Sequence, residues 1–134
     1  MQSQLQTIEP ALFGSIPGHN YLGFMDKESH FNHKKVVDYL GLSQNEVAKA
    51  TRVARTSVRY DARIPEELAQ RLTEIGIICE LVAGYFKGDA QKTNLWLNTP
   101  NTLLGNMSPK EMIRFGRYRK LHKFITNALA GNHP

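Results

Sequence analysis

The chain has 134 residues, of which 41% are hydrophobic and 22% charged, and its formal net charge is +5. A single cysteine, Cys79, excludes an internal disulfide and a thiolate-rich zinc cage, and no stretch approaches the roughly 18 apolar residues that a membrane span needs. The first residues also lack a basic start followed by an apolar run, so we expect a cytoplasmic protein of one domain or two small ones.

The positive charge is concentrated in two segments. Residues 43–64 hold five Lys and Arg against two acidic residues, a net charge of +3, and residues 106–134 hold six against one, a net charge of +5. The segment between them, residues 65–105, has three basic and five acidic residues. A basic balance usually means solvated surface, but two separated basic blocks favour a polyanionic or acidic partner.

Residues 1–33 show neither a helical nor a strand period. We expect a partly ordered arm, with some of its aromatic residues packed on the body. His30 and His33 could face one way on a helix, but no carboxylate or thiol stands at clear ligand spacing. We therefore expect solvated histidines and no metal site.

Two short helices should follow the arm. Apolar residues between Lys34 and Gly41 recur with a helical period, and Gly41 ends the run. Ser43 and Glu46 then form a Ser-x-x-Glu capping box, which predicts the start of a second helix before Val47.

The stretch SQNEVAKATRVARTSVRYD resembles the helix-turn-helix of the Xre repressor class, with Val53 in the turn and Val58 anchoring the second helix. It departs from that pattern at Arg52, where the class usually has glycine, and at Asp61, where an apolar residue is expected. The resemblance implies DNA contacts by side chains that face outward. These candidate residues are Gln44, Arg55, Thr56, Arg59 and Tyr60. The alternative is a plain helical hairpin with a solvated basic face.

The strongest periodic pattern lies between Pro65 and Phe86. Apolar residues at spacings of three and four predict one helix of about 22 residues that begins near Pro65 and ends before Gly88. Further apolar residues widen this face, so we expect a connecting helix that touches partners on two sides. The alternative is an ordinary core helix of one compact domain. In either case Cys79 should be buried.

Three helices should follow the connecting helix. Asp89 is placed to cap the first, Ser108 and Glu111 form a second capping box, and the last helix should span roughly residues 117–130. We expect a core built from the large apolar residues of this region. They are Trp96, Leu97, Leu103, Leu104, Met112 and Phe115.

The stretch GDAQKTNLWLNTPNTLLGNMSPKEMIRFGRYRKLHKFI resembles the toxin-binding domain of the MbcA/ParS/Xre antitoxin family. The match rests on Trp96-Leu97, Pro100-Asn101, Leu104-Gly105, Ser108-Pro109 with Met112-Ile113, and Gly116-Arg117. The resemblance implies an antitoxin that neutralises a RES-domain toxin that destroys NAD. It also implies repression of the protein's own promoter DNA. We expect a homodimer, because a single DNA-binding domain reads too few bases and operator half-sites mirror two-fold symmetry. Long side chains expected to be exposed, together with the tail, are the candidate toxin contacts: Arg114, Arg117, Tyr118, Arg119, His122, Asn132 and His133.

Together these features predict an all-α fold. Its parts would be an arm (1–33), a helix-turn-helix domain (34–64), a connecting helix (65–88) and a toxin-binding domain (89–134). No phosphate loop follows a strand and no nucleophile spacing is present, so we expect neither catalysis nor a cofactor. The alternative function is a DNA-binding regulator or partition-type adaptor without a toxin partner.

Overall fold

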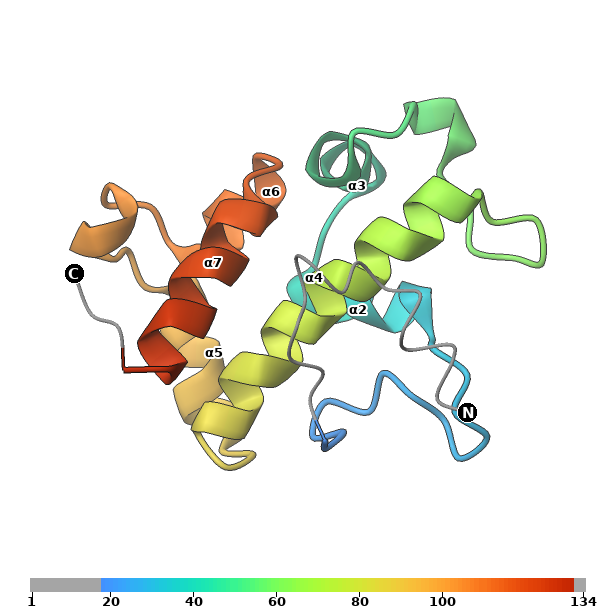
Figure 1. The fold of residues 1–134 in the computed structure, drawn as a ribbon. Helices are drawn as coiled ribbons and strands as arrows, with labels where there is room; N and C mark the ends of the chain where they lie inside the picture. The colour runs from blue at the N-terminus through green and yellow to red at the C-terminus, as the bar shows by residue number, and fades with distance from the viewer. Residues whose placement is uncertain (1–17, 132–134) are drawn as a thin grey trace.

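The computed structural model describes residues 18–131, which form helices joined by short turns (Figure 1). In chain order the elements are α2 (His33–Leu40), α3 (Gln44–Thr51), the 3-10 turn η1 (Arg55–Ser57), α4 (Glu66–Tyr85), α5 (Ala90–Asn98), the 3-10 turn η2 (Thr102–Leu104), α6 (Pro109–Arg114) and α7 (Tyr118–Leu129). Within residues 18–131 the only extended pairings are two isolated bridges, at Met25 with Phe31 and at Asn101 with Met107. The predicted all-α class is therefore confirmed.

The connecting helix is α4, which runs through the middle of the molecule between α2 and α7 (Figure 1). It begins one residue after Pro65, and Gly88, with φ of +83°, follows its last turn. Leu68, Leu72 and Ile75 are fully buried on it. The prediction that this helix touches partners on two sides is confirmed.

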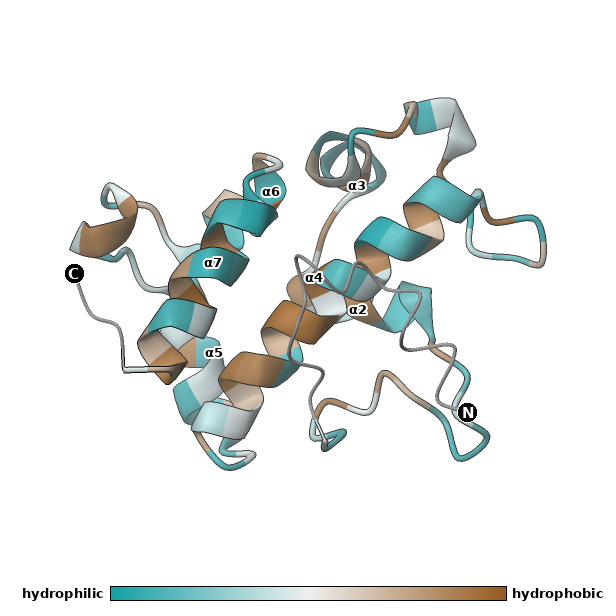
Figure 2. Ribbon diagram, in the orientation of Figure 1, coloured by the Kyte–Doolittle hydropathy of each residue, from teal (hydrophilic) through white to brown (hydrophobic). Residues whose placement is uncertain are grey.

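The buried apolar side chains form one continuous cluster that draws on α2, α3, α4, α5, α6 and α7. Apolar residues dominate the C-terminal half of α4, whereas the outer face of α7 is polar (Figure 2). Cys79 lies inside this cluster with no exposed surface, as predicted. Helix α4 is thus both a long connection and the core helix of one packed body. No helix of residues 18–131 is both long and apolar enough to cross a membrane.

The helix starts agree with the sequence pattern. Ser43 with Glu46 and Ser108 with Glu111 both form capping boxes, in which each side chain bonds the other residue's backbone N–H. The Asp89 side chain caps α5 as expected, and the Asn32 side chain caps α2 in the same way. These local bonds satisfy N–H groups that the first helical turn leaves without partners.

Two residues expected in the core are exposed instead. Leu103 is 64% exposed on η2, and Phe115 is 43% exposed at the end of α6, where the Lys49 Nζ lies 4.7 Å from the centroid of its ring. Leu97 and Met112 are buried as predicted. The expectation failed for Leu103 because the turn around it closes on its own backbone bonds and leaves that side chain on the outside.

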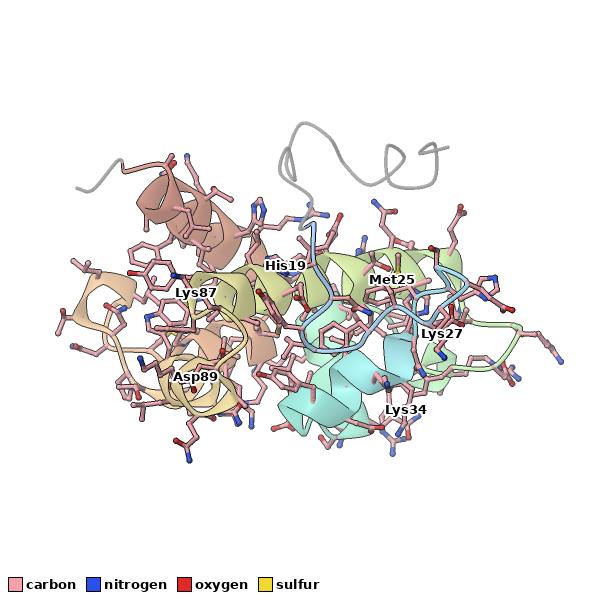
Figure 3. The ribbon with its side chains drawn as sticks, turned by 90° about the horizontal axis from the view of Figure 1, so that it is seen from below. His19, Met25, Lys27, Lys34, Lys87 and Asp89 are labelled. Atoms are coloured by element: carbon pink, nitrogen blue, oxygen red, sulfur yellow. The ribbon has the colours of Figure 1, made fainter. Side chains whose placement is uncertain are left out.

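The described part of the arm, residues 18–32, lies along α4 and α2 (Figure 3). Phe24 is buried against the core, which confirms that arm aromatics pack on the body, while residues 1–17 lie outside the described residues. His30 is exposed as expected. His33 is not fully solvated, because it is half-buried at the start of α2 with its Nε2 3.2 Å from the Thr73 hydroxyl.

Candidate functional site

The first basic group follows α3, and its backbone differs from the expected pair of helices. Arg52 ends α3 with a left-handed φ of +58°, and the second helix is only the single 3-10 turn η1. Val58 is extended and closes that turn with one bond from its N–H to the Arg55 carbonyl. The departure at Arg52 is therefore accommodated in the backbone conformation that glycine usually adopts at a helix end.

Side-chain contacts hold η1 against the beginning of α3. The Gln44 Nε2 lies 3.4 Å from the Arg55 carbonyl oxygen and 3.5 Å from that of Val58. Arg55 and Thr56 are exposed on η1, and Gln44 is exposed beside them. The structure thus brings three of the five candidate DNA-contacting residues together.

The other two candidates belong to the segment after η1. The Arg59 Nε donates to Asp61 Oδ1 at 2.8 Å, and the same carboxylate accepts the Arg63 N–H. The hydrogen bond from Arg59 is the main reason that the pKa of Asp61 is lowered. Asp61 therefore orders a surface loop instead of filling a core position. Tyr60 is half-buried, and this burial raises its pKa.

The candidate toxin-contacting residues separate into exposed and buried ones. Arg117 and Arg119 are exposed at the start of α7, and Arg114 is half-buried with its Nε 3.8 Å from Glu46. Tyr118 and His122 are only 4% and 2% exposed, so the expectation that their side chains are exposed was wrong. Both lie on the side of α7 that packs against the body. The last two candidates, Asn132 and His133, lie outside the described residues.

Tyr118 is buried because it meets a carboxylate inside the molecule. Its hydroxyl donates to Glu74 Oε1 at 2.6 Å, and the Arg119 Nη2 lies 3.6 Å from the same oxygen. Glu74 has no exposed surface. Burial and then the hydrogen bond to Glu74 raise the pKa of Tyr118 well above its usual range. Sequence reasoning missed this site, because Glu74 stands within the apolar pattern of α4 and nothing near it points to residue 118.

An exposed turn is the second feature that the sequence did not indicate. The Asn101 N–H donates to the Met107 carbonyl, and the Asn101 side chain accepts the Leu103 N–H at 2.9 Å. These bonds fix a loop, residues 101–107, with Leu103 exposed on it. The Arg117 Nη1 lies 3.7 Å from the Met107 sulfur, so an arginine lies against the same loop. A leucine and a guanidinium are thus presented by one small ordered surface.

One group of possible metal ligands occurs among residues 18–131. Ligand atoms of Asp26, Glu28 and His30 lie within 4.8 Å of one another, and all three residues are exposed. The Asp26 carboxylate also accepts the backbone N–H groups of Glu28 and His30, and the bond from His30 is the largest cause of its lowered pKa. These bonds give the carboxylate a structural role in the turn before α2.

The chain is similar to proteins named mycobacterial cidal antitoxin MbcA, from Mycobacterium tuberculosis (strain ATCC 25618 / H37Rv) and Mycobacterium bovis. Each is 30% identical over 93 residues, which cover 66% of this chain and 80% of the relative. A crystal structure of the M. tuberculosis MbcT–MbcA toxin–antitoxin complex contains a chain of 24% identity, with a TM-score of 0.48 and coverage of 77% of this chain and 95% of that one. No protein-family model matches the chain.

Proposed function

This chain belongs to the family of MbcA antitoxins, and on that premise we propose that it neutralises a RES-domain toxin and represses its own promoter as a cytoplasmic homodimer. The antitoxin role is supported by the relatives, which are named antitoxins. The RES class of the toxin and the promoter binding rest on the sequence resemblances of residues 89–134 and 43–61. A homodimer would place one helix-turn-helix domain on each of the two half-sites of an operator.

The observation that best supports toxin binding is the surface formed by loop 101–107 and Arg117. It combines an exposed leucine, which can enter an apolar pocket, with an arginine, a residue type enriched at interface hot spots. The buried Tyr118 and His122 fix α7 to the body, so the exposed Arg117 and Arg119 are presented from a rigid helix. We therefore assign the toxin contact to this surface and to the chain beyond Leu129.

Growth rescue with a co-expressed RES-domain toxin tests this assignment. Leu103→Asp should abolish protection, because it places a charge where an apolar side chain would dock. Leu95→Asp is the matched control, since Leu95 is exposed to a similar degree, 69%, on α5. Truncation after Leu129 should also reduce protection. Full protection by both Leu103→Asp and the truncated protein would contradict the proposed contact surface.

Promoter binding is assigned to η1 and the adjacent start of α3. Arg55→Ala should weaken binding by about 1–3 kcal/mol if the guanidinium reads a base, and should flatten the salt dependence if it contacts a phosphate. The effect of Arg59→Ala should be smaller, because this arginine is already paired with Asp61. Lys92→Ala, on α5, controls for the loss of one positive charge. If the protein binds its promoter but neutralises no RES-domain toxin, the alternative of a DNA-binding regulator without a toxin partner is favoured.

A further inference from the structure

A cleft of about 280 Å³ opens between the end of α3, the first half of α4 and the beginning of α7. None of its lining residues belongs to η1 or to loop 101–107. Each of the three helices contributes one arginine to its lining: Arg52, Arg71 and Arg119. Thr51 and Tyr118 complete the polar part of the wall. Three arginines from three separate parts of the chain therefore line one concave site.

Arg52 has a backbone conformation that is unusual for an arginine. Its φ of +58° lies in the left-handed region, which favours glycine over any residue with a Cβ. The guanidinium has no ion-pair partner within residues 18–131, and its Nε lies 3.4 Å from where a Cβ on Gly116 would be. A strained backbone thus carries an unpaired positive charge to the cleft, a combination that often marks functional positions.

The other two arginines are held in place by bonds that leave donors available. Arg71 donates from Nη1 to the Thr51 carbonyl at 2.8 Å and from Nη2 to Glu67 at 3.0 Å. Arg119 is positioned by the buried Glu74, 3.6 Å from its Nη2. A guanidinium has five N–H donors, so both residues retain donors for a further ligand. Both carboxylates are already engaged, and Arg52 has no acidic partner among the described residues, so the part of the site formed by residues 18–131 is positive.

We propose that this cleft binds the phosphate group of a small phosphorylated molecule. The planar fork of arginine matches phosphate oxygens in a bidentate way, and three such forks suit an anion with more than one negative charge. The volume accommodates a phosphate or pyrophosphate group with a small attached part, and lies just below the usual range of about 300–1,000 Å³ for ligand pockets.

The position of the cleft favours a small molecule over a DNA backbone as the source of the phosphate. The candidate DNA contacts gather at the beginning of α3, where Gln44 meets η1. Arg52 lies at the other end of this eight-residue helix, about 12 Å away along its axis. The cleft therefore lies at the end of α3 opposite to the candidate contacts of Gln44, and the experiment below tests a duplex as the other source of the phosphate.

Calorimetric titration with inorganic pyrophosphate at constant ionic strength tests the proposal. The informative variant is Arg52→Gly, because glycine is the residue best suited to this φ and the protein should fold at least as well. Loss of one charge-assisted contact should weaken binding by about tenfold or more. Lys92→Ala, which removes an exposed positive charge elsewhere, should bind as the wild type does. Absence of saturable binding to the wild type, or equal binding to Arg52→Gly, would overturn the proposal.

A competition arm separates the two sources of phosphate. A promoter duplex should bind the Arg52→Gly protein as tightly as the wild type, and should leave pyrophosphate bound. Displacement of pyrophosphate by the duplex, together with a tenfold weaker duplex affinity of Arg52→Gly, would show that the cleft holds a DNA backbone phosphate and would overturn the small-molecule assignment.

Discussion

Helix α4 holds two carboxylates in the interior, and their surroundings differ. Glu74 has no exposed surface and Glu80 only 6%. The partners of Glu74 are side chains of α7, the Tyr118 hydroxyl at 2.6 Å and the more distant Arg119. The partners of Glu80 belong to the arm before α2: the N–H groups of Tyr21 and Leu22, at 2.6 and 3.0 Å, and the ring of His19, at 2.7 Å (Figure 3).

This difference determines what each carboxylate can stabilise. The helix that meets Glu74 also buries Leu121 and Ile125 in the core, so it cannot leave without opening the molecule. The segment that meets Glu80 precedes the first described helix. Because no helix lies on its N-terminal side among the described residues, we expect residues 19–22 to detach while α2 remains packed. We therefore expect Glu74 to govern global unfolding and Glu80 to govern local opening of the arm.

The largest effect should come from Glu74→Ala. It removes the acceptor of a buried hydroxyl and leaves a cavity, which together should lower the free energy of unfolding by about 3 kcal/mol. Urea denaturation measures the loss. Glu67→Ala, an exposed carboxylate on the same helix, is the control and should cost less than about 1 kcal/mol. Equal losses in the two variants would remove the distinction drawn for the buried site.

Glu80→Ala should have a smaller global effect, about 1–2 kcal/mol, because the freed N–H groups can turn to water once the arm detaches. Its characteristic result should be local. Amide hydrogen exchange at Tyr21 and Leu22 should become fast while exchange in the middle of α4 stays slow. A global loss as large as that of Glu74→Ala would mean that the arm is part of the cooperative core.

Two glycine substitutions can measure how strongly the arm is held. Gly88 has a φ of +83°, and a Cβ there would lie 2.6 Å from the Tyr21 ring, whereas Gly105 has a φ of +67° with no atom within 4 Å of such a Cβ. Both Ala variants should lose about 1 kcal/mol from the backbone alone. Any additional loss of stability in Gly88→Ala measures the cost of displacing the Tyr21 ring from the end of α4. Equal melting temperatures for the two variants would show that this contact contributes nothing.

The sequence predicted the starts of most helices well, but it predicted a second helix after α3 where the structure has only the turn η1, and it predicted the contacts between helices poorly. Helix starts are local properties: a glutamate three positions away identifies Ser43 and Ser108, and the helical stretch that follows identifies Asp89. The exposure of Leu103 depends on the bonds that Asn101 makes across its loop. A composition rule that places leucine in the core could not anticipate this.

The candidate site was predicted only in part for the same reason. Arg117 and Arg119 are exposed as expected, but Tyr118 lies between them and faces inward, because a helix turns by about 100° at each residue. Which of these three meets the body depends on the partner helix α4 and its Glu74, 44 positions earlier in the chain. Periodicity of one segment does not contain that information.

The smallest effect concerns pH and tests the α7 side of the comparison. Burial lowers the pKa of His122, so the folded protein holds this ring neutral. Between the folded pKa and the ordinary value of about 6.5 the unfolded chain binds more protons, so the free energy of unfolding rises with pH there. Stability should therefore fall as the pH drops below about 6.5.

Substitution of single histidines separates the contributions to this pH dependence. Burial also lowers the pKa of His33, which contacts α4 from the opposite side, so both rings act in the same direction. His122→Gln should flatten the dependence of urea midpoint on pH between 7 and 5, and His33→Gln should flatten it further when combined. The His30→Gln variant, which changes an exposed ring, is the control. If His122→Gln leaves the slope unchanged, the ring binds protons equally in the folded and unfolded states, and its burial on α7 does not lower its pKa.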